Sequence, residues 1–406
     1  MMRAKPAMLS LLLAALFSGI SSNAIIGDPA SATAVPKVGH VFIIVLENEG
    51  YATTFGKSSP AKYLNVLATK GALLQSYYGI GHYSLDNYIA MISGQGPNFV
   101  TQNDCGDYVD FNERSIAAYG QAVGSGCVYP KNILTIADQF QQAGLSWRAY
   151  MEDMGNDINR ESSTCGHPRL GGADGTQKAE PQDQYAVRHD PFVYFQSIIG
   201  SPVCDANVVN LSALPIALAS ATATPNYVFI TPNLCNDGHD GGDGKHCKNG
   251  DPGGLISADK FLAQWVPKIL MSPAFKLDGL LIITFDESDT DDATACCGEQ
   301  LGPNISPDQK VFDDPDRGPG VTGPGGGRIG AVLLSPFIEP GTVSSTPYNH
   351  YALLKSVEDI FNLPHLGYAG QPGLVGLGSD VFRNPQSETS PTRRVLPPEK
   401  QSPGPD

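Results

Sequence analysis

Five runs of apolar and β-branched residues recur along the chain and alternate with segments of helical periodicity. The runs are HVFIIVLEN (40–48), LSWRAYMED (145–153), NYVFITPN (226–233), GLLIITFDES (279–288) and RIGAVLLSPF (328–337). Their almost continuous hydrophobicity predicts strands that are covered on both faces, as in a largely parallel sheet.

The segments between these strands have apolar residues at helical spacing. Six helices are predicted, over residues 60–71, 84–93, 135–144, 190–199, 257–271 and 350–361. Thr135 and Ser257 are suitable N-caps, and Gly144 is a suitable stop after its helix. Strands that alternate with helices predict an α/β fold, a three-layer α/β/α sandwich around a largely parallel central sheet.

The two ends of the chain differ in composition from the rest of its 406 residues. Residues 1–24 combine a short basic start, a short apolar run and small residues up to Ala24, which predicts a signal peptide and an exported protein. The apolar run is too short for a membrane span, and no other stretch approaches that length. Residues 384–406 are rich in Pro and Ser, which predicts a disordered tail. A single domain is therefore expected over residues 25–383.

Two long polar loops, 154–184 and 289–327, interrupt this domain and carry cysteines. The eight cysteines lack zinc-ribbon spacing and favour disulfides, in agreement with export. The expected pairs are Cys105 with Cys127 and Cys165 with Cys204. Cys296 and Cys297 are expected to bridge to Cys235 and Cys247.

The formal net charge of −15 makes nucleic acid or an anionic membrane an unfavourable partner. It does not exclude small phosphate esters, because metals and local cations can override the global sign. Acidic clusters without a basic patch favour metal binding instead.

Polar side chains gather where the predicted strands end, which is where open α/β sheets bind their ligands. Glu47 and Asn48 follow the first strand, Asn233 follows the third and Asp286 and Glu287 follow the fourth, while His350 opens the last helix. Each residue alone reads as an ordinary loop or cap residue. Together, carboxylates and imidazoles at one sheet edge indicate a divalent metal, since unneutralised carboxylates would repel one another.

Six ordered blocks make a specific resemblance. They are HVFIIVLENEGYATTFG, GHYSLDNYIAMISG, VRHDPFVYF, PNLCNDGHDGG, IITFDESD and YNHYALLKSVEDIFNLPHLG. Between about His40 and Gly367 the chain resembles the phosphoesterase family, which includes bacterial acid phosphatases, phosphatidylinositol-3-phosphatase-like enzymes and phospholipases C. That family belongs to the alkaline-phosphatase-like superfamily, so the resemblance implies the same fold and a phosphoesterase domain over residues 25–383.

The resemblance also implies roles for individual residues. Ser84, which alone reads as a helix cap, would be the nucleophile, and Asn87 would hold a phosphoryl oxygen. The metal ligands would be Glu47, Asn48, Ser84, Asp286 and Glu287. A second metal or phosphate subsite would include Asn233, His239, Asp240 and His350, with Asp237 as a competing candidate for the place of Asp240.

These roles imply a secreted, metal-dependent acid phosphatase that hydrolyses monoesters through a phosphoserine. Its substrate would be a small-molecule or lipid-headgroup phosphate ester. The alternatives are a phospholipase C or other phosphodiesterase, and an inactive exported binding protein of the same fold. Oxygen-rich ligands suit calcium, magnesium or manganese, and the histidines also admit zinc.

Overall fold

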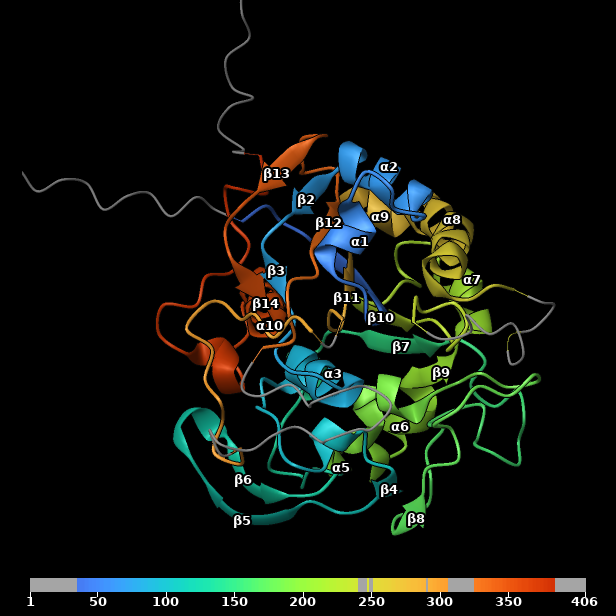
Figure 1. Cartoon of the computed structure of the whole chain (residues 1–406), viewed down its shortest axis with the longest axis vertical. Helices are drawn as coiled ribbons and strands as arrows, with labels where there is room; N and C mark the ends of the chain where they lie inside the picture. The colour runs from blue at the N-terminus through green and yellow to red at the C-terminus, as the bar shows by residue number, and fades with distance from the viewer. Residues whose placement is uncertain (1–34, 240–246, 248–250, 290, 306–324, 384–406) are drawn as a thin grey trace, which may run out of the picture. The chain divides into compact units, whose positions relative to one another are not determined.

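The computed structural model describes residues 35–239, 247, 251–289, 291–305 and 325–383 (Figure 1). The predicted signal peptide, the predicted tail and Asp240 lie outside these residues. No helix among the described residues is long and apolar enough to cross a membrane.

An eight-stranded sheet forms the centre of the described chain, in the order β13-β2-β12-β11-β1-β10-β7-β9. Its strands are β1 (His40–Leu46), β2 (Ala72–Leu74), β7 (Trp147–Met151), β9 (Val208–Asn210), β10 (Tyr227–Thr231), β11 (Gly279–Phe285), β12 (Ala331–Leu334) and β13 (Thr342–Ser344). From β11 through β9 all neighbouring strands are parallel. β12 runs antiparallel to both β11 and β2. The predicted α/β class with a largely parallel sheet is confirmed.

The strands predicted from continuous hydrophobicity form the middle of this sheet. Every residue of β1, β10 and β11 is buried. β1 lies between the other two, and its last residue, Leu46, is level with Phe285 of β11. The residues that follow β1 and β11 therefore emerge together at the carboxyl edge of the sheet.

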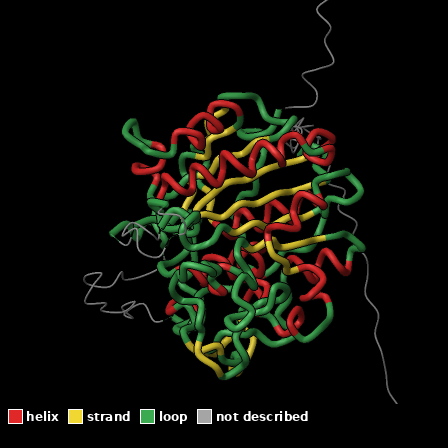
Figure 2. Tube along the Cα trace, turned by 90° about the vertical axis from the view of Figure 1, so that its right-hand side faces the viewer, coloured by secondary structure: helices red, strands yellow, loops and turns green. Residues whose placement is uncertain are grey.

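Helices lie on both sides of the strands (Figure 2). In one group, α8 (Gly254–Met271) contacts both α2 (Lys62–Lys70) and α9 (Pro273–Asp278). In another, α3 (Ser84–Ser93) contacts both α4 (Ile136–Gln142) and α10 (His350–Phe361). Shorter helices are α1 (Tyr51–Phe55), α5 (Gln196–Ile199), α6 (Val203–Asn207) and α7 (Leu214–Ala217). Outside the main sheet, three small ladders pair β3 (Tyr77–Tyr78) with β14 (Tyr348–Asn349), β4 (Asp107–Tyr108) with β8 (Gly172–Ala173), and β5 (Asn112–Ile116) with β6 (Ala122–Ser125).

The predicted helix ends were right at one helix and wrong at another. Thr135 caps α4 in a capping box with Asp138, and Gly144 follows the helix with φ +70°. Ser257 does not cap α8, because that helix begins three residues earlier at Gly254. The Ser257 hydroxyl accepts a hydrogen bond from the Gly253 amide at 3.1 Å instead.

The helix predicted over 190–199 is broken. Its first part is a 3-10 turn (Pro191–Tyr194), its second part is α5, and Phe195 between them is extended. The backbone on either side of Phe195 exchanges hydrogen bonds with Tyr129, with Tyr129 N–H donating to Tyr194 and Gln196 N–H donating to Tyr129. This pairing of extended backbone replaces the helical hydrogen bonds at Phe195 and interrupts the predicted helix.

All eight cysteines are paired in four disulfides. The predicted pairs Cys105–Cys127 and Cys165–Cys204 are confirmed. The prediction for the other four is wrong, because Cys235 pairs with Cys247 and Cys296 with its neighbour Cys297. Closing the short loop between Cys235 and Cys247 costs little chain entropy. Cys297 adopts φ +65°, a turn that brings the adjacent cysteines together.

Candidate active site

Glu47 and Asp286 lie side by side at the carboxyl edge of the sheet, directly after β1 and β11. The Asp286 amide donates to the Leu46 carbonyl at 2.9 Å, which continues the strand pairing by one residue. Asn48 turns the chain with φ +51° and donates its amide to Asp286 Oδ1 at 2.9 Å. The parallel register therefore brings together carboxylates that are 239 positions apart in the sequence.

Ser84 is the first residue of α3, and its side chain points at Glu47. The Ser84 hydroxyl donates to Glu47 Oε2 at 2.6 Å, and the Tyr88 hydroxyl donates to Glu47 Oε1 at 2.6 Å. Ser84 does not cap the helix, since Tyr83 holds the N-cap position and has no side-chain cap bond. The alternative interpretation of Ser84 as a helix cap is therefore wrong. The hydroxyl is oriented by a carboxylate.

Asn87 holds the turn that leads into Ser84. Its Oδ1 accepts from the Ile80 amide at 2.8 Å, and its Nδ2 donates to the carbonyls of Gly81 and Tyr83 at 2.9 and 3.1 Å. These bonds support Tyr83, whose φ of +72° is unusual for a residue with a side chain. Asn87 thus fixes the backbone next to Ser84.

A glycine-rich segment, residues 325–327, joins the Ser84 turn to the Asp286 loop. The Gly326 amide donates to the Gly79 carbonyl at 3.1 Å, and the Ser288 amide donates to the Gly326 carbonyl at 2.8 Å. A Cβ atom on Gly79 would lie 2.7 Å from the Asp286 carbonyl oxygen. Only glycine permits this approach of three backbone segments.

The carboxylates of the site repel one another in a buried environment. Burial raises the pKa of Glu47 well above its usual value, and the charges of Asp286 and Asp237 raise it further. Burial and the charge of Glu287 raise the pKa of Asp286 to about 8. Asp286 Oδ2 is buried and has no hydrogen-bond partner within the described residues.

The carboxylate oxygens of the site are of the kind that bind a divalent cation. No group of three or more His, Cys, Asp or Glu side chains in the described part of the chain is already arranged around a metal position. However, the buried carboxylates of Glu47, Asp286 and Glu287 are hard oxygen donors whose repulsion a cation would relieve. The unsatisfied Asp286 Oδ2 and the side-chain oxygen of Asn48 agree with that donor set.

His350 lies against the Asp286 backbone. One ring nitrogen, Nε2, is 2.5 Å from the Asp286 carbonyl oxygen, and Nδ1 is 3.1 Å from the Tyr77 hydroxyl. Burial lowers the pKa of His350 to about 4, so the ring is neutral at neutral pH. In this arrangement the ring braces the loop after β11.

The remaining residues of the predicted second subsite lie around the turn after β10. The Asn233 side chain donates to Asp153 Oδ2 at 2.9 Å and accepts from the Cys235 amide at 3.1 Å. Asp237 is buried, its Oδ1 accepts from the His239 amide at 3.0 Å, and its charge acts on Glu47. His239 is exposed. Asp237 therefore lies close to Glu47, whereas the Asn233 side chain stabilises the turn after β10.

Two histidines outside the set of predicted site residues also reach the site carboxylates. His82 Nδ1 lies 2.5 Å from Glu287 Oε2, and His189 Nε2 lies 3.3 Å from Glu47 Oε2. The His189 ring stacks on Tyr88, with ring centroids 5.3 Å apart. Both histidines stand inside sequence blocks that carry the family resemblance, but only the folded chain reveals which carboxylate each one meets.

The Ser84 hydroxyl therefore donates to a buried carboxylate that lies beside further buried carboxylates at the carboxyl edge of a parallel sheet. Residues 57–364 match the Phosphoesterase family, and the chain belongs to that family.

Individual relatives agree with this assignment. The phosphate-repressible acid phosphatase of Penicillium chrysogenum is 28% identical over 84% of this chain and 65% of its own length. The phosphatidylinositol-3-phosphatase of Mycobacterium tuberculosis is 25% identical over 84% of this chain and 82% of its own. The chain spans about three fifths of the length of the fungal acid phosphatases that it matches. Among solved structures, an alkaline phosphatase superfamily protein from Vibrio parahaemolyticus is 12% identical over 82% of this chain and 68% of its own, with a TM-score of 0.43.

Proposed function

We propose that the chain is an exported phosphomonoesterase in which Ser84 is the nucleophile. The observation that carries the proposal is the 2.6 Å hydrogen bond from the Ser84 hydroxyl to Glu47, at the start of a buried helix. A free serine hydroxyl is a weak nucleophile at neutral pH, and an adjacent acceptor for its proton activates it. Acid phosphatases among the relatives favour monoesters as the substrate class.

The proposed reaction has two steps. Ser84 Oγ bonds to phosphorus, its proton passes to Glu47 Oε2, and the bond from phosphorus to the leaving oxygen breaks. The departing alcohol takes its proton from water. The hydroxide left by that water then attacks the phosphoserine, the bond from phosphorus to Ser84 Oγ breaks, and Ser84 Oγ takes back the proton held by Glu47 as inorganic phosphate leaves.

Glu47, Asn48, Asp286 and Glu287 would hold a divalent cation. When bound, the cation would stabilise negative charge on the serine oxygen and on the phosphoryl group. The chain's own residues provide the rest of the arrangement. Tyr88 and Asn48 donate to Glu47 at 2.6 and 3.0 Å and fix its carboxylate, and Asn87 fixes the turn before Ser84.

Export is part of the proposal. It is supported by the composition of residues 1–24 and by four disulfides, which persist in oxidising compartments.

The test compares p-nitrophenyl phosphate with bis-p-nitrophenyl phosphate on the purified chain supplied with Mg²⁺, Ca²⁺, Mn²⁺ or Zn²⁺. We expect higher kcat/KM on the monoester. A preference for the diester would support a phospholipase C or another phosphodiesterase instead. No turnover of either ester with any of the four cations would support an inactive binding protein.

Two variants test the nucleophile. Ser84→Ala is expected to lower kcat by a factor on the order of 10³ or more. Ser93→Ala is a matched control, because Ser93 is also buried in α3, where its hydroxyl donates to the Ile89 carbonyl and accepts from the Gln95 amide at the far end of the helix. Near-normal hydrolysis by Ser84→Ala would refute the nucleophile. Exhaustive EDTA treatment should abolish activity, and undiminished turnover would remove the metal from the mechanism.

A further inference from the structure

The helix that begins at Ser84 is capped by a residue from a distant loop. Tyr83, at the N-cap position, offers no side-chain bond to the first turn. Asp104 Oδ1 accepts a hydrogen bond from the Leu85 amide at 3.0 Å instead. An acidic group at this end also interacts favourably with the helix dipole. Asp104 therefore does for α3 what a local cap residue usually does.

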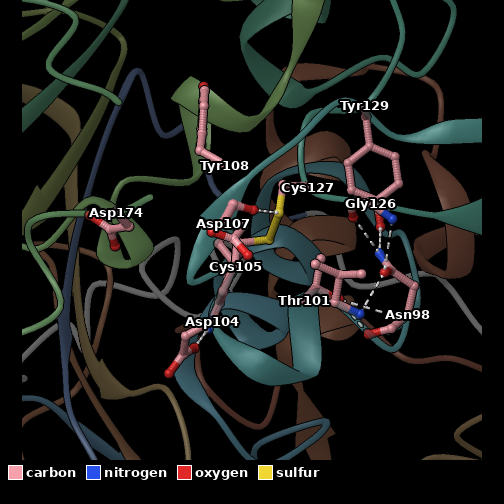
Figure 3. Close-up of a disulfide and its surroundings, with 12 residues drawn as sticks. Asn98, Thr101, Asp104, Cys105, Asp107, Tyr108, Gly126, Cys127, Tyr129 and Asp174 are labelled. Carbon is pink, nitrogen blue, oxygen red and sulfur yellow. Dashed lines mark hydrogen bonds between the residues drawn. A yellow bond between two sulfur atoms is a disulfide. The ribbon is translucent and has the colours of Figure 1, made fainter. Parts of the chain in front are cut away.

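The position of Asp104 is fixed from several sides. Cys105, its neighbour, is bonded to Cys127, and the disulfide lies next to Asp104 in Figure 3. Gln177 Nε2 donates to the Asp104 carbonyl at 3.1 Å. Asp104 and Cys105 have φ values of +51° and +49°, which cost free energy for residues with side chains. Such a conformation persists where its surroundings hold it in place.

Asp104 also contacts the segment on the other side of the Ser84–Glu47 hydrogen bond. Asp104 Oδ2 lies 3.8 Å from Arg188 Nε, and both side chains are largely shielded from solvent. Arg188 precedes His189 in the 3-10 turn Val187–His189, and His189 approaches Glu47. One carboxylate thus joins the helix of the nucleophile to the turn that lies against its proton acceptor.

We propose that Asp104 is a positioning residue for the reaction at Ser84. The inference rests on the proposed role of Ser84 and adds that Asp104, held beside the Cys105–Cys127 disulfide, sets the direction of the Ser84 hydroxyl. Because Leu85 is the next residue, a change in the Leu85 amide hydrogen bond rotates the first turn of α3 and moves Ser84 Oγ relative to Glu47. Misplacement of a reacting atom by about 1 Å can lower a rate by roughly a hundredfold.

The test measures kcat and KM for Asp104→Ala, Asp104→Asn and Asp104→Glu on p-nitrophenyl phosphate, at a temperature where each variant is folded by circular dichroism. Asp104→Ala removes the acceptor and is expected to lower kcat by about 10- to 100-fold with KM within about twofold. Asp104→Asn keeps an oxygen for the Leu85 amide and should recover most of kcat. Asp104→Glu moves the carboxylate by one methylene and should resemble Asp104→Ala, which makes it the substitute if the alanine variant does not fold.

Asn98→Ala is the matched control for loss of stability. Asn98 is buried in the segment between α3 and Cys105, and it donates to the Gly126 carbonyl inside the disulfide-closed loop and to the Tyr129 hydroxyl (Figure 3). We expect a lower Tm with kcat per folded molecule within about twofold of wild type. A similar fall in kcat for Asn98→Ala would overturn the inference, because it would show a general effect of loop stability.

Other outcomes separate this inference from the proposed function. If Ser84→Ala is inactive while Asp104→Ala keeps kcat within twofold of wild type, only the positioning role is refuted. If Asp104→Asn is as impaired as Asp104→Ala, the hydrogen bond to Leu85 is not the cause, and the positioning role is refuted as well. If Ser84→Ala remains active, the proposed function itself is refuted.

Discussion

At the scale of single residues, the candidate site is a set of carboxylates whose orientation is fixed by hydrogen-bond donors. Glu47 accepts hydrogen bonds from Ser84, Tyr88 and Asn48. Each such bond favours the charged form of the carboxylate, whereas burial and neighbouring charges favour the neutral form. Burial and the neighbouring charges outweigh these bonds, so the pKa of Glu47 is raised. A cation would reverse that balance, since it attracts the charged form.

His82 is expected to support cation binding through Glu287. Its ring bridges Glu287 Oε2, at 2.5 Å, and the Asp292 carbonyl, at 3.0 Å, so it limits where that carboxylate can point. We predict that His82→Ala weakens divalent cation binding by about 10- to 100-fold. Equilibrium dialysis of the metal-free protein against Mg²⁺, Ca²⁺, Mn²⁺ or Zn²⁺ measures this affinity without relying on activity.

His40→Ala is the matched control for this prediction. His40 forms the same kind of pair, with Asp278 at 2.6 Å, but it begins β1 and therefore lies at the opposite edge of the sheet. Cation affinity should be unchanged in His40→Ala. Equal weakening in both variants would mean that loss of stability, and not the orientation of Glu287, governs binding.

At the scale of elements, backbone contacts join the two halves of the site. Residues 325–327 run beside residues 79–81 through hydrogen bonds from Gly325 to Ile80, from Gly326 to Gly79 and from Gly79 to Gly327. The turn before Ser84 and the loop after β11 are thereby linked without any side chain. The relative position of Ser84 and Asp286 then depends on the absence of Cβ atoms at this crossing.

Gly326→Ala is expected to disturb that crossing. Its Cβ would overlap the Gly81 carbonyl oxygen and approach the backbone of Gly79. Crowding of this kind costs about 1 to 3 kcal/mol of unfolding free energy, which urea denaturation measures. Gly175→Ala is the control, because a Cβ there meets nothing within 4 Å and its φ is not in the left-handed region. Equal stability of the two variants would contradict the prediction.

Much of this element-level arrangement was predictable, and the reasons for the failures are physical. Hydrophobic runs indicated β1, β7, β10, β11 and β12 because these strands are buried on both faces. The three-residue strands β2, β9 and β13 were missed, since three residues carry too little periodicity to be recognised. The direction of β12 was also hidden, because a buried antiparallel strand has the same composition as a parallel one.

The candidate site, too, could be predicted only in part from the sequence. Glu47 and Asp286 were found because strand ends predict where polar residues meet. The links from His189 to Glu47 and from Asp104 to Leu85 cross between elements that no local pattern relates. The Cys296–Cys297 bridge was missed because the positive φ of Cys297, which permits it, is set by the folded loop.

At the scale of the whole molecule, buried acids outside the site make stability depend on pH. Burial raises the pKa of Glu358 from 4.5 to about 8, and its Oε1 accepts from the Leu366 amide at 2.8 Å. Burial, followed by its interaction with Asp183, raises the pKa of Glu161 to about 8 as well. Both carboxyls are therefore protonated in the folded chain at neutral pH and ionised in the unfolded chain.

The sign of the effect follows from this difference. The folded state binds more protons than the unfolded state between about pH 4.5 and pH 8, so stability falls as pH rises through that window. Below about pH 4.5 both carboxyls are protonated in the folded and in the unfolded chain, so their contribution to stability is fully present. We predict that the EDTA-treated protein has a lower urea midpoint near pH 8 than near pH 5, with each buried acid adding at most about 1.4 kcal/mol per pH unit to the slope.

Glu358→Gln tests the origin of this slope. The glutamine amide is close to the protonated carboxyl in shape, and its oxygen can still accept from the Leu366 amide. Its NH₂ group can donate to Gln139 Oε1, which has no hydrogen-bond partner within the described residues. The variant should therefore match wild type near pH 5 and exceed it near pH 8. Glu339→Gln is the control, because Glu339 is exposed and pairs only with the half-exposed Arg383. A Glu358→Gln curve parallel to that of wild type would show that Glu358 titrates normally in the folded protein.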